Sequence, residues 1–199
     1  MTLTNAEIVA RFKALSNYSL RANDGSTTTL VANKLIDVRD VTGFYLCFTS
    51  GDNYGVDRVI TDFDEVTGTL TFDTLGTTVL NTDEVCLLED GFATEIKQAE
   101  IFLINHLRNK SLDIELFLEV AQLKEAHIYK TLELVCLNYA KDAVDDDMFY
   151  TASQMYKGLY EAELGSLVAD YDENEDGQIS EDEEDMQVGQ VSFTRWKSI

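Results

Sequence analysis

Oxygen-bearing side chains recur at a regular spacing in residues 172–183, close to the carboxyl end of the chain. Calcium takes about six to eight hard oxygen ligands, and a twelve-residue loop can present them from its positions one, three, five, seven, nine and twelve. The seventh position contributes its backbone carbonyl, the ninth usually acts through water, and the twelfth is a bidentate glutamate. In this chain those positions are held, in order, by Asp172, Asn174, Asp176, Gln178, Ser180 and Glu183. The spacing therefore predicts a site for Ca²⁺.

Two more residues of the same segment fit an EF-hand calcium loop. Gly177 stands where such a loop bends sharply, and Ile179 stands where its apolar anchor belongs. The competing interpretation is a chance match in a very acidic chain, but an excess of acids does not supply these two residues. EF-hand sensors work in pairs and the sequence contains a single loop, so we expect the ion to be structural rather than regulatory.

The charge balance argues against ordinary binding to nucleic acids. The 199 residues include 37 acids and 15 bases, which gives a formal net charge of -22. Proteins bind DNA by displacing counterions from phosphates with lysine and arginine, so we expect no sequence-specific nucleic acid partner. An acidic surface would suit the wall of a channel through which DNA slides. The plainer interpretation is that acidity keeps the protein soluble.

The sequence lacks the common patterns of catalytic centres. Its two histidines, His106 and His127, do not form a His-Glu-x-x-His zinc pair. Between Asp145 and Asp185 there are fifteen acids and one base, Lys157, so no pair of carboxylates can be singled out as a catalytic dyad. We therefore expect a protein that is not an enzyme, with an unrecognised acidic active site as the alternative.

Nothing in the sequence predicts a membrane segment. Glu7 lies in the first turn of a predicted helix, and no long apolar region follows a basic start, so we expect no signal peptide. No apolar run approaches the ~20 residues that cross a bilayer. We expect a cytoplasmic product with no membrane partner. Its three cysteines, Cys47, Cys86 and Cys136, each lie in an apolar stretch and are predicted to be reduced core residues.

The first half of the chain changes from a helical to a strand pattern. Thr4 and Glu7 have the spacing of a capping box, which predicts a helix over residues 5–16. Residues 25–89 are rich in threonine, valine, aromatic and turn residues, and they predict four or five short strands. One face of the clearest strand carries Phe44, Leu46 and Phe48.

The helical period returns after Gly91. Apolar residues that recur every three or four positions predict helices over residues 94–108 and 116–141, and a further helix is expected from the carboxylates at 145–147 to about residue 169. The expected fold class is α+β, a helical bundle with a small inserted antiparallel β-barrel or sandwich module and an EF-hand-like loop before a carboxyl-terminal arm.

This fold divides the chain into five expected parts. They are the first helix of the bundle (1–24), the inserted β module (25–90), the bundle core (91–171), the calcium loop (172–185) and the arm (186–199). The arm is short, aromatic and basic after a long acidic stretch. Its candidate docking residues are Phe193, Arg195, Trp196, Lys197 and Ile199. Tryptophan and arginine often anchor interfaces, so we expect an arm that docks on a partner; the alternative is that Trp196 folds back onto the bundle.

Several stretches together resemble proteins of tailed bacteriophages. Residues 48–51, 57–62 and 67–72 resemble β modules inserted in phage proteins, and residues 122–129 and 154–161, followed by the calcium loop and a tail with Arg195, are similar to head-to-tail connector or adaptor proteins. The resemblance implies a ring beneath the portal, a dodecamer, that joins capsid to tail and leaves a channel for DNA. It also implies that the arm docks on the portal, that a neck, stopper, terminator or tail protein binds the other side, and that the protein lies in the virion neck after assembly in the host cytoplasm.

The leading hypothesis is therefore a structural adaptor ring. The alternative from another class is a monomeric EF-hand-like or dockerin-like calcium-binding interaction module, which would form calcium-dependent complexes without a ring.

Overall fold

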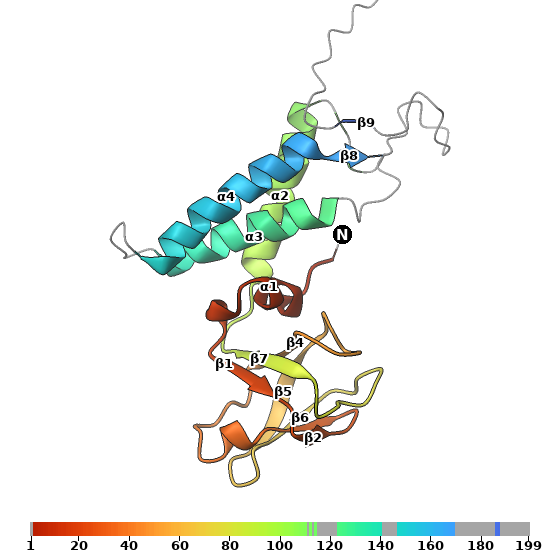
Figure 1. Ribbon diagram of the computed structural model, residues 1–199, viewed down its shortest axis with the longest axis vertical. Coiled ribbons are helices and arrows are strands. Elements are labelled where there is room, and N and C mark those ends of the chain that lie inside the picture. The colour runs from red at the N-terminus through yellow and green to blue at the C-terminus, as the bar shows by residue number, and fades with distance from the viewer. Residues whose placement is uncertain are drawn as a thin grey trace, which may run out of the picture. The chain divides into compact units, whose positions relative to one another are not determined.

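The structure is a computed structural model (Figure 1). The residues that it describes are 2–110, 112, 114, 123–140, 147–169 and 186–187. Within this part of the chain the fold is α+β, with four α-helices and an antiparallel sheet of seven strands that curls into a half-barrel. The chain forms two compact units: a sheet unit of residues 2–93, and a helical unit that begins at Thr94.

The sheet unit opens with helix α1 (Asn5–Arg11). The predicted capping box is confirmed, because Thr4 Oγ1 accepts a hydrogen bond from the Glu7 amide while the Glu7 carboxylate accepts one from the Thr4 amide. The helix is shorter than predicted and is followed by a 3-10 turn, η1 (Lys13–Leu15).

Residues 2–24 belong to the sheet unit, so the expected division between a bundle helix and a β module at residue 25 does not appear. A helix of seven residues has one short apolar face, and α1 places its face against strand β4 (Tyr45–Phe48), with Ile8 and Val9 fully buried. The chain then continues directly into strand β1 (Tyr18–Arg21) of the same sheet.

The sheet runs in the order β1-β7-β4-β5-β6-β3-β2, and every neighbouring pair is antiparallel. The remaining strands are β2 (Asp24–Gly25), β3 (Thr29–Val31), β5 (Asp57–Asp64), β6 (Thr69–Phe72) and β7 (Glu84–Leu88). A second 3-10 turn, η2 (Asn33–Leu35), follows β3. Pairing of β1 with β7 joins the beginning of the unit to its last strand.

Both faces of the central strands are buried. Phe44, Leu46 and Phe48 face one core, as their alternation predicts, and Phe48 meets the edge of the Phe72 ring with centroids 6.1 Å apart. On the other face Cys47 and Cys86 are paired in register across β4 and β7. All three cysteines are buried and free, which confirms their prediction as core residues. Burial raises the pKa of the Cys47 thiol far above its usual value.

Side chains join the ends of the sheet unit. The Phe92 amide donates to Asn5 Oδ1 at 2.8 Å, in a buried hydrogen bond between residues 87 positions apart. The Asn5 amide in turn donates to Asp57 Oδ2 at 2.9 Å. The start of α1 is thereby held to β5 and to the segment that leaves the unit.

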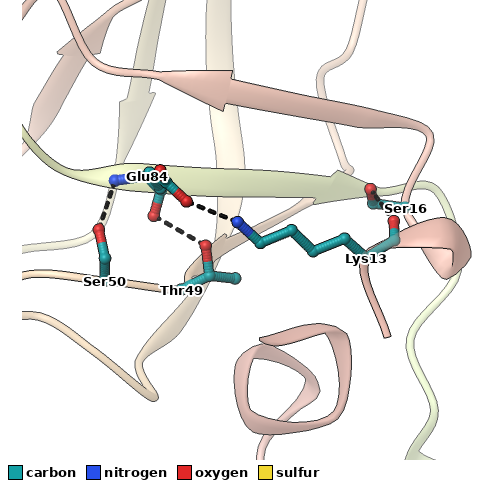
Figure 2. A network of polar contacts seen from close by, with 5 residues as sticks. All are labelled: Lys13, Ser16, Thr49, Ser50 and Glu84. Atoms are coloured by element: carbon teal, nitrogen blue, oxygen red, sulfur yellow. Dashed lines mark hydrogen bonds and ion pairs between the residues drawn. The ribbon is translucent and has the colours of Figure 1, made fainter. Parts of the chain in front are cut away.

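A polar network holds η1 and the end of β4 to the start of β7 (Figure 2). Lys13 Nζ contacts Glu84 Oε2 at 2.5 Å, the Glu84 amide donates to Ser50 Oγ at 2.7 Å, and Thr49 Oγ1 donates to the Glu84 carbonyl at 3.1 Å. The hydrogen bond and charge of Lys13 lower the pKa of Glu84. Both charged side chains are about half exposed, so this ion pair contributes little to stability.

The helical unit contains α2 (Ala93–Asn109), α3 (Lys124–Tyr139) and α4 (Met148–Ser166). Helices α3 and α4 lie side by side, and α2 crosses behind them (Figure 1). The core between the helices consists of Leu103, Leu107, Leu112, Leu123, Ala126, Tyr160, Leu164 and Leu167. No helix among the described residues is long and apolar enough to cross a bilayer.

The predicted boundaries hold for α2, whereas α3 begins at Lys124 instead of residue 116 and ends at Tyr139 instead of residue 141, and α4 ends at Ser166 instead of about residue 169. Helix α2 begins and ends within one residue of the predicted 94–108. Asp147 caps α4, since Asp147 Oδ1 accepts hydrogen bonds from the Phe149 and Tyr150 amides. After α4, two short strands, β8 (Val168–Ala169) and β9 (Met186–Gln187), pair in an antiparallel manner.

Candidate interaction surface on the helical unit

The predicted calcium ligands and arm residues lie outside the described part of the chain. They are Asp172, Asn174, Asp176, Gln178, Ser180 and Glu183 of the loop, and Phe193, Arg195, Trp196, Lys197 and Ile199 of the arm. Pairing of β8 with β9 places Ala169 opposite Met186, so the backbone on the two sides of residues 170–185 comes together. Among the residues with described side chains, no group of three or more His, Cys, Asp or Glu is placed to hold a metal ion.

A buried ion pair lies on α3, and its lysine contacts aromatic rings of the other two helices. Lys130 Nζ lies 2.8 Å from Glu133 Oε2 on α3, and these side chains are only 12% and 9% exposed. The same ammonium group lies 4.5 Å from the ring centroid of Phe102 on α2 and 5.3 Å from that of Tyr160 on α4. Burial and the nearby Glu133 charge raise the pKa of Tyr160 to about 12. Lys130 is therefore fixed by a carboxylate and two aromatic rings, one residue from each helix.

His127 is a second buried polar side chain between α2 and α3. It is fully buried, and its Nε2 lies 2.8 Å from the Ile96 carbonyl, so this nitrogen carries the proton and donates. Its Nδ1 has no hydrogen-bond partner among the described residues. Burial lowers the pKa of His127, which keeps the imidazole neutral. This neutral histidine therefore packs between helices and stabilises the contact between α2 and α3.

A cavity of about 330 Å³ lies at the α2–α4 contact. Its lining residues are His106, Lys110, Tyr160, Glu161, Leu164 and Gly165. Burial, with the charge of Lys110, lowers the pKa of His106. The lining residues that the structure describes offer an imidazole, an ammonium group, a phenol and a carboxylate, and none of them is a serine, threonine or cysteine that could act as a nucleophile paired with the histidine.

Helix α4 exposes a broad uncharged face. Met148, Met155 and Leu159 are 56%, 51% and 38% exposed, and their spacing of seven and four residues places them on one side of the helix. The remaining exposed residues of this α4 face are small or uncharged: Thr151, Gly158, Ala162 and Ser166. The opposite side of α4 is packed inward through Tyr156, Tyr160 and Leu164.

Helix α2 exposes a different kind of face. Ile101 and Phe102 are each 50% exposed; Ile101 lies opposite the inward stripe of the same helix, whereas Phe102 lies at its side, next to Lys130 of α3. The other exposed residues of this α2 face are Lys97, Gln98, Asn105 and Arg108. The two acids of α2, Glu95 and Glu100, are half-buried, so the exposed charge of the face is positive.

Exposed apolar residues of the sheet unit are arranged differently. Val66, the most exposed of them at 74%, lies in the turn between β5 and β6, and Tyr54 lies in the turn between β4 and β5. Single apolar residues at loop tips are normal on protein surfaces, whereas apolar residues aligned along a helix are a candidate interaction surface. The α2 and α4 faces are therefore the strongest candidate site in the described part of the chain.

Comparison with known proteins gives no assignment: no family model, no curated protein and no solved structure matches this chain.

Proposed function

We propose that this protein is a structural subunit of the neck of a tailed bacteriophage, an adaptor that forms a ring under the portal and joins capsid to tail. The observation that supports the proposal best is that the helical unit of a chain with net charge -22 exposes aligned apolar side chains on α2 and α4. A highly charged protein that keeps apolar side chains aligned on exposed helix faces has a surface suited to other protein chains. The resemblance of residues 122–129 and 154–161 to adaptor proteins supports the choice of partner.

In this proposal the units have different tasks. The helices form a bundle that carries the ring contacts, while the half-barrel is a β module inserted before it. Residues 172–183 hold a structural Ca²⁺ as an EF-hand-like loop, and the arm that follows docks on the portal through residues such as Trp196. The acidic surface leaves the DNA channel without groups that retain DNA. The protein works in the virion neck and is not an enzyme.

The spacing of the loop residues also supports a second function, a monomeric EF-hand-like or dockerin-like calcium module. Both functions predict calcium binding. They differ in assembly, because an adaptor requires many copies around one axis, and a module requires one copy per partner.

The test is to produce the chain together with the portal protein encoded near its gene and to examine the product by electron microscopy and native mass spectrometry. We expect a ring of this chain on the portal, with a central channel. A chain that stays monomeric, does not bind the portal and forms one-to-one complexes only with calcium would refute the adaptor and support the calcium module.

A further inference from the structure

We infer that the cavity at the α2–α4 contact is a binding site for a small organic carboxylate, a molecule with one negative charge and a compact apolar body such as one aromatic ring. The inference goes beyond the proposed function and is independent of it, because it concerns a ligand held by a single copy of the chain. It rests on the size of the cavity, on hydrogen-bond donors in its wall and on the apolar residues beside them.

The volume of the cavity suits a small molecule. It measures about 330 Å³, which lies at the lower end of the range of about 300–1,000 Å³ that is usual for ligand sites. An apolar cavity of about 150 Å³ in another protein binds benzene, so a cavity of about twice that volume has room for a ring and a charged group. The volume therefore admits an aromatic carboxylate.

The α2 side of the cavity supplies hydrogen-bond donors. His106 lies in the last turn of α2, and Lys110 follows directly after the helix. The Lys110 amide donates to the Leu107 carbonyl at 2.8 Å, so the backbone continues its turn and places Lys110 on the same side as His106, four residues before it. The ammonium group offers three donors, and a neutral imidazole offers one.

Among the described residues, neither of these donors has a partner. Both side chains are half-buried, yet no described carboxylate forms an ion pair with Lys110 and no described group hydrogen-bonds to the His106 ring. Polar groups withdrawn from bulk water are nearly always hydrogen-bonded. A carboxylate in the cavity would provide a partner for each, because its two oxygens can accept bonds from two separate donors.

The charges of the wall indicate a ligand with a single negative charge. Burial, with the charge of Lys110, lowers the pKa of His106, so the imidazole is neutral near pH 7.5 and Lys110 supplies the positive charge of the described lining residues. The other charge of the described lining is the carboxylate of Glu161, which opposes a second negative charge on a ligand. A carboxylate carries one charge and a phosphate monoester nearly two, so the wall favours the carboxylate.

The α4 side of the cavity supplies apolar surface that is already in place. Tyr160 and Leu164 are four residues apart on one side of the helix, and they are 8% and 3% exposed. Both belong to the core of the helical unit, and the Tyr160 ring also lies against the Lys130 ammonium group, 5.3 Å from the ring centroid. A wall that is fixed before the ligand arrives loses little conformational entropy on binding.

The experiment is an NMR titration of the isotope-labelled full chain with benzoate near pH 7.5. We expect saturable shifts of the amide signals of Lys110 and Gly165, which both line the cavity, with a dissociation constant in the millimolar range or lower. Benzamide has the same ring without the charge and should bind at least about tenfold more weakly, because hydrogen bonds between charged groups are the stronger ones. Phenyl phosphate, with its second charge, should also bind more weakly than benzoate.

Two variants test the wall of the cavity. Lys110→Gln removes the charge and should raise the dissociation constant of benzoate at least about tenfold. Gly165→Leu occupies cavity volume and should abolish the shifts. A Cβ at Gly165 or at Gly158 would meet no atom within 4 Å, so each position accepts a side chain without a clash. Gly158→Leu makes the same change on α4 outside the described lining, and as the matched control it should bind benzoate like wild type.

Three results would overturn the inference. Wild type without saturable shifts would show that the cavity holds water only. Benzamide that binds as tightly as benzoate, or phenyl phosphate that binds more tightly, would refute the assignment of a carboxylate. Lys110→Gln and Gly165→Leu chains that bind benzoate like wild type would show that benzoate binds elsewhere. Circular dichroism checks the folding of each variant, and Lys110→Gln alone decides this last point if Gly165→Leu does not fold.

Discussion

Removing either partner of the buried Lys130–Glu133 pair should destabilise the helical unit, and the two removals should differ. Losing one partner of a buried ion pair typically costs about 3–5 kcal/mol, because the other charge stays buried. Lys130→Met leaves Glu133, which is 9% exposed, without a cation, so we expect a loss of about 3 kcal/mol in the free energy of unfolding.

Glu133→Leu should cost less. The remaining ammonium group still faces the rings of Phe102 and Tyr160 at 4.5 and 5.3 Å, and each such contact contributes about 0.5–1 kcal/mol. We expect a loss of about 2 kcal/mol for this variant. The double variant leaves no unpaired charge and should lie within about 1 kcal/mol of wild type.

Thermal unfolding followed by circular dichroism measures these differences. For a unit of about 100 residues, each kcal/mol moves the Tm by roughly 4–8 °C, so Lys130→Met should lower it by about 12 °C or more. Glu89→Gln is the control, because it breaks the exposed pair with Arg39 and should leave the Tm nearly unchanged. An unchanged Tm for Lys130→Met, or a double variant as unstable as the sum of the single ones, would show that the pair is not buried as described.

Four further predictions concern other parts of the chain. Burial holds the pKa of His127 below its unfolded value of about 6.5, so the stability that the neutral imidazole provides is complete above that pH and is lost as the pH falls through the folded pKa. The Tm advantage of wild type over His127→Gln should therefore shrink between pH 7.5 and pH 5. A Tm difference that stays constant over this range would contradict the prediction. Gly51 has a φ of 78°, and a Cβ there would overlap Asp83 Oδ1. Gly51→Ala should therefore lower the free energy of unfolding in denaturant by about 1–3 kcal/mol. A neutral effect would mean that the loops that carry Gly51 and Asp83 can move apart without cost. Calcium should raise the Tm of wild type but not of Glu183→Gln, with titration calorimetry as the check; equal heats in both would remove the metal site. A chain that ends at Gly189 should keep its helical circular dichroism and lose binding to the portal, whereas unfolding would identify the arm as part of the core.

The local elements of the fold were predictable where short-range patterns determine them. The capping box of Thr4 and Glu7 forms as predicted, and alternation places Phe44 and Leu46 in the sheet core. Strand β1 was missed because it has four residues and only Leu20 is fully buried, so its pattern is too short to recognise. The packing of α1 against the sheet could not be predicted either, because an apolar stripe shows that a helix packs against another element but does not identify that element.

The candidate site shows the same limit. Apolar residues at helical spacing predicted the helix over residues 94–108, and Ala99, Leu103 and Leu107 form its inward stripe. The two exposed apolar residues of α2, Ile101 and Phe102, could equally have been covered by another helix. Their exposure depends on which side of α2 the α3–α4 pair occupies, and this is decided by tertiary packing that no local pattern encodes.

The buried hydrogen bond from the Phe92 amide to Asn5 Oδ1 has a consequence for how such a protein can change over evolution. The first strand of the sheet unit pairs with its last strand, and the chain begins and leaves the unit at one place, so the unit has a single point of attachment to the rest of the protein. A cassette of this kind can be excised, transplanted or exchanged for another while the helices keep their packing. Residues 2–93 should therefore fold when produced alone, and recombination can give related chains different half-barrels, or none, on one helical framework.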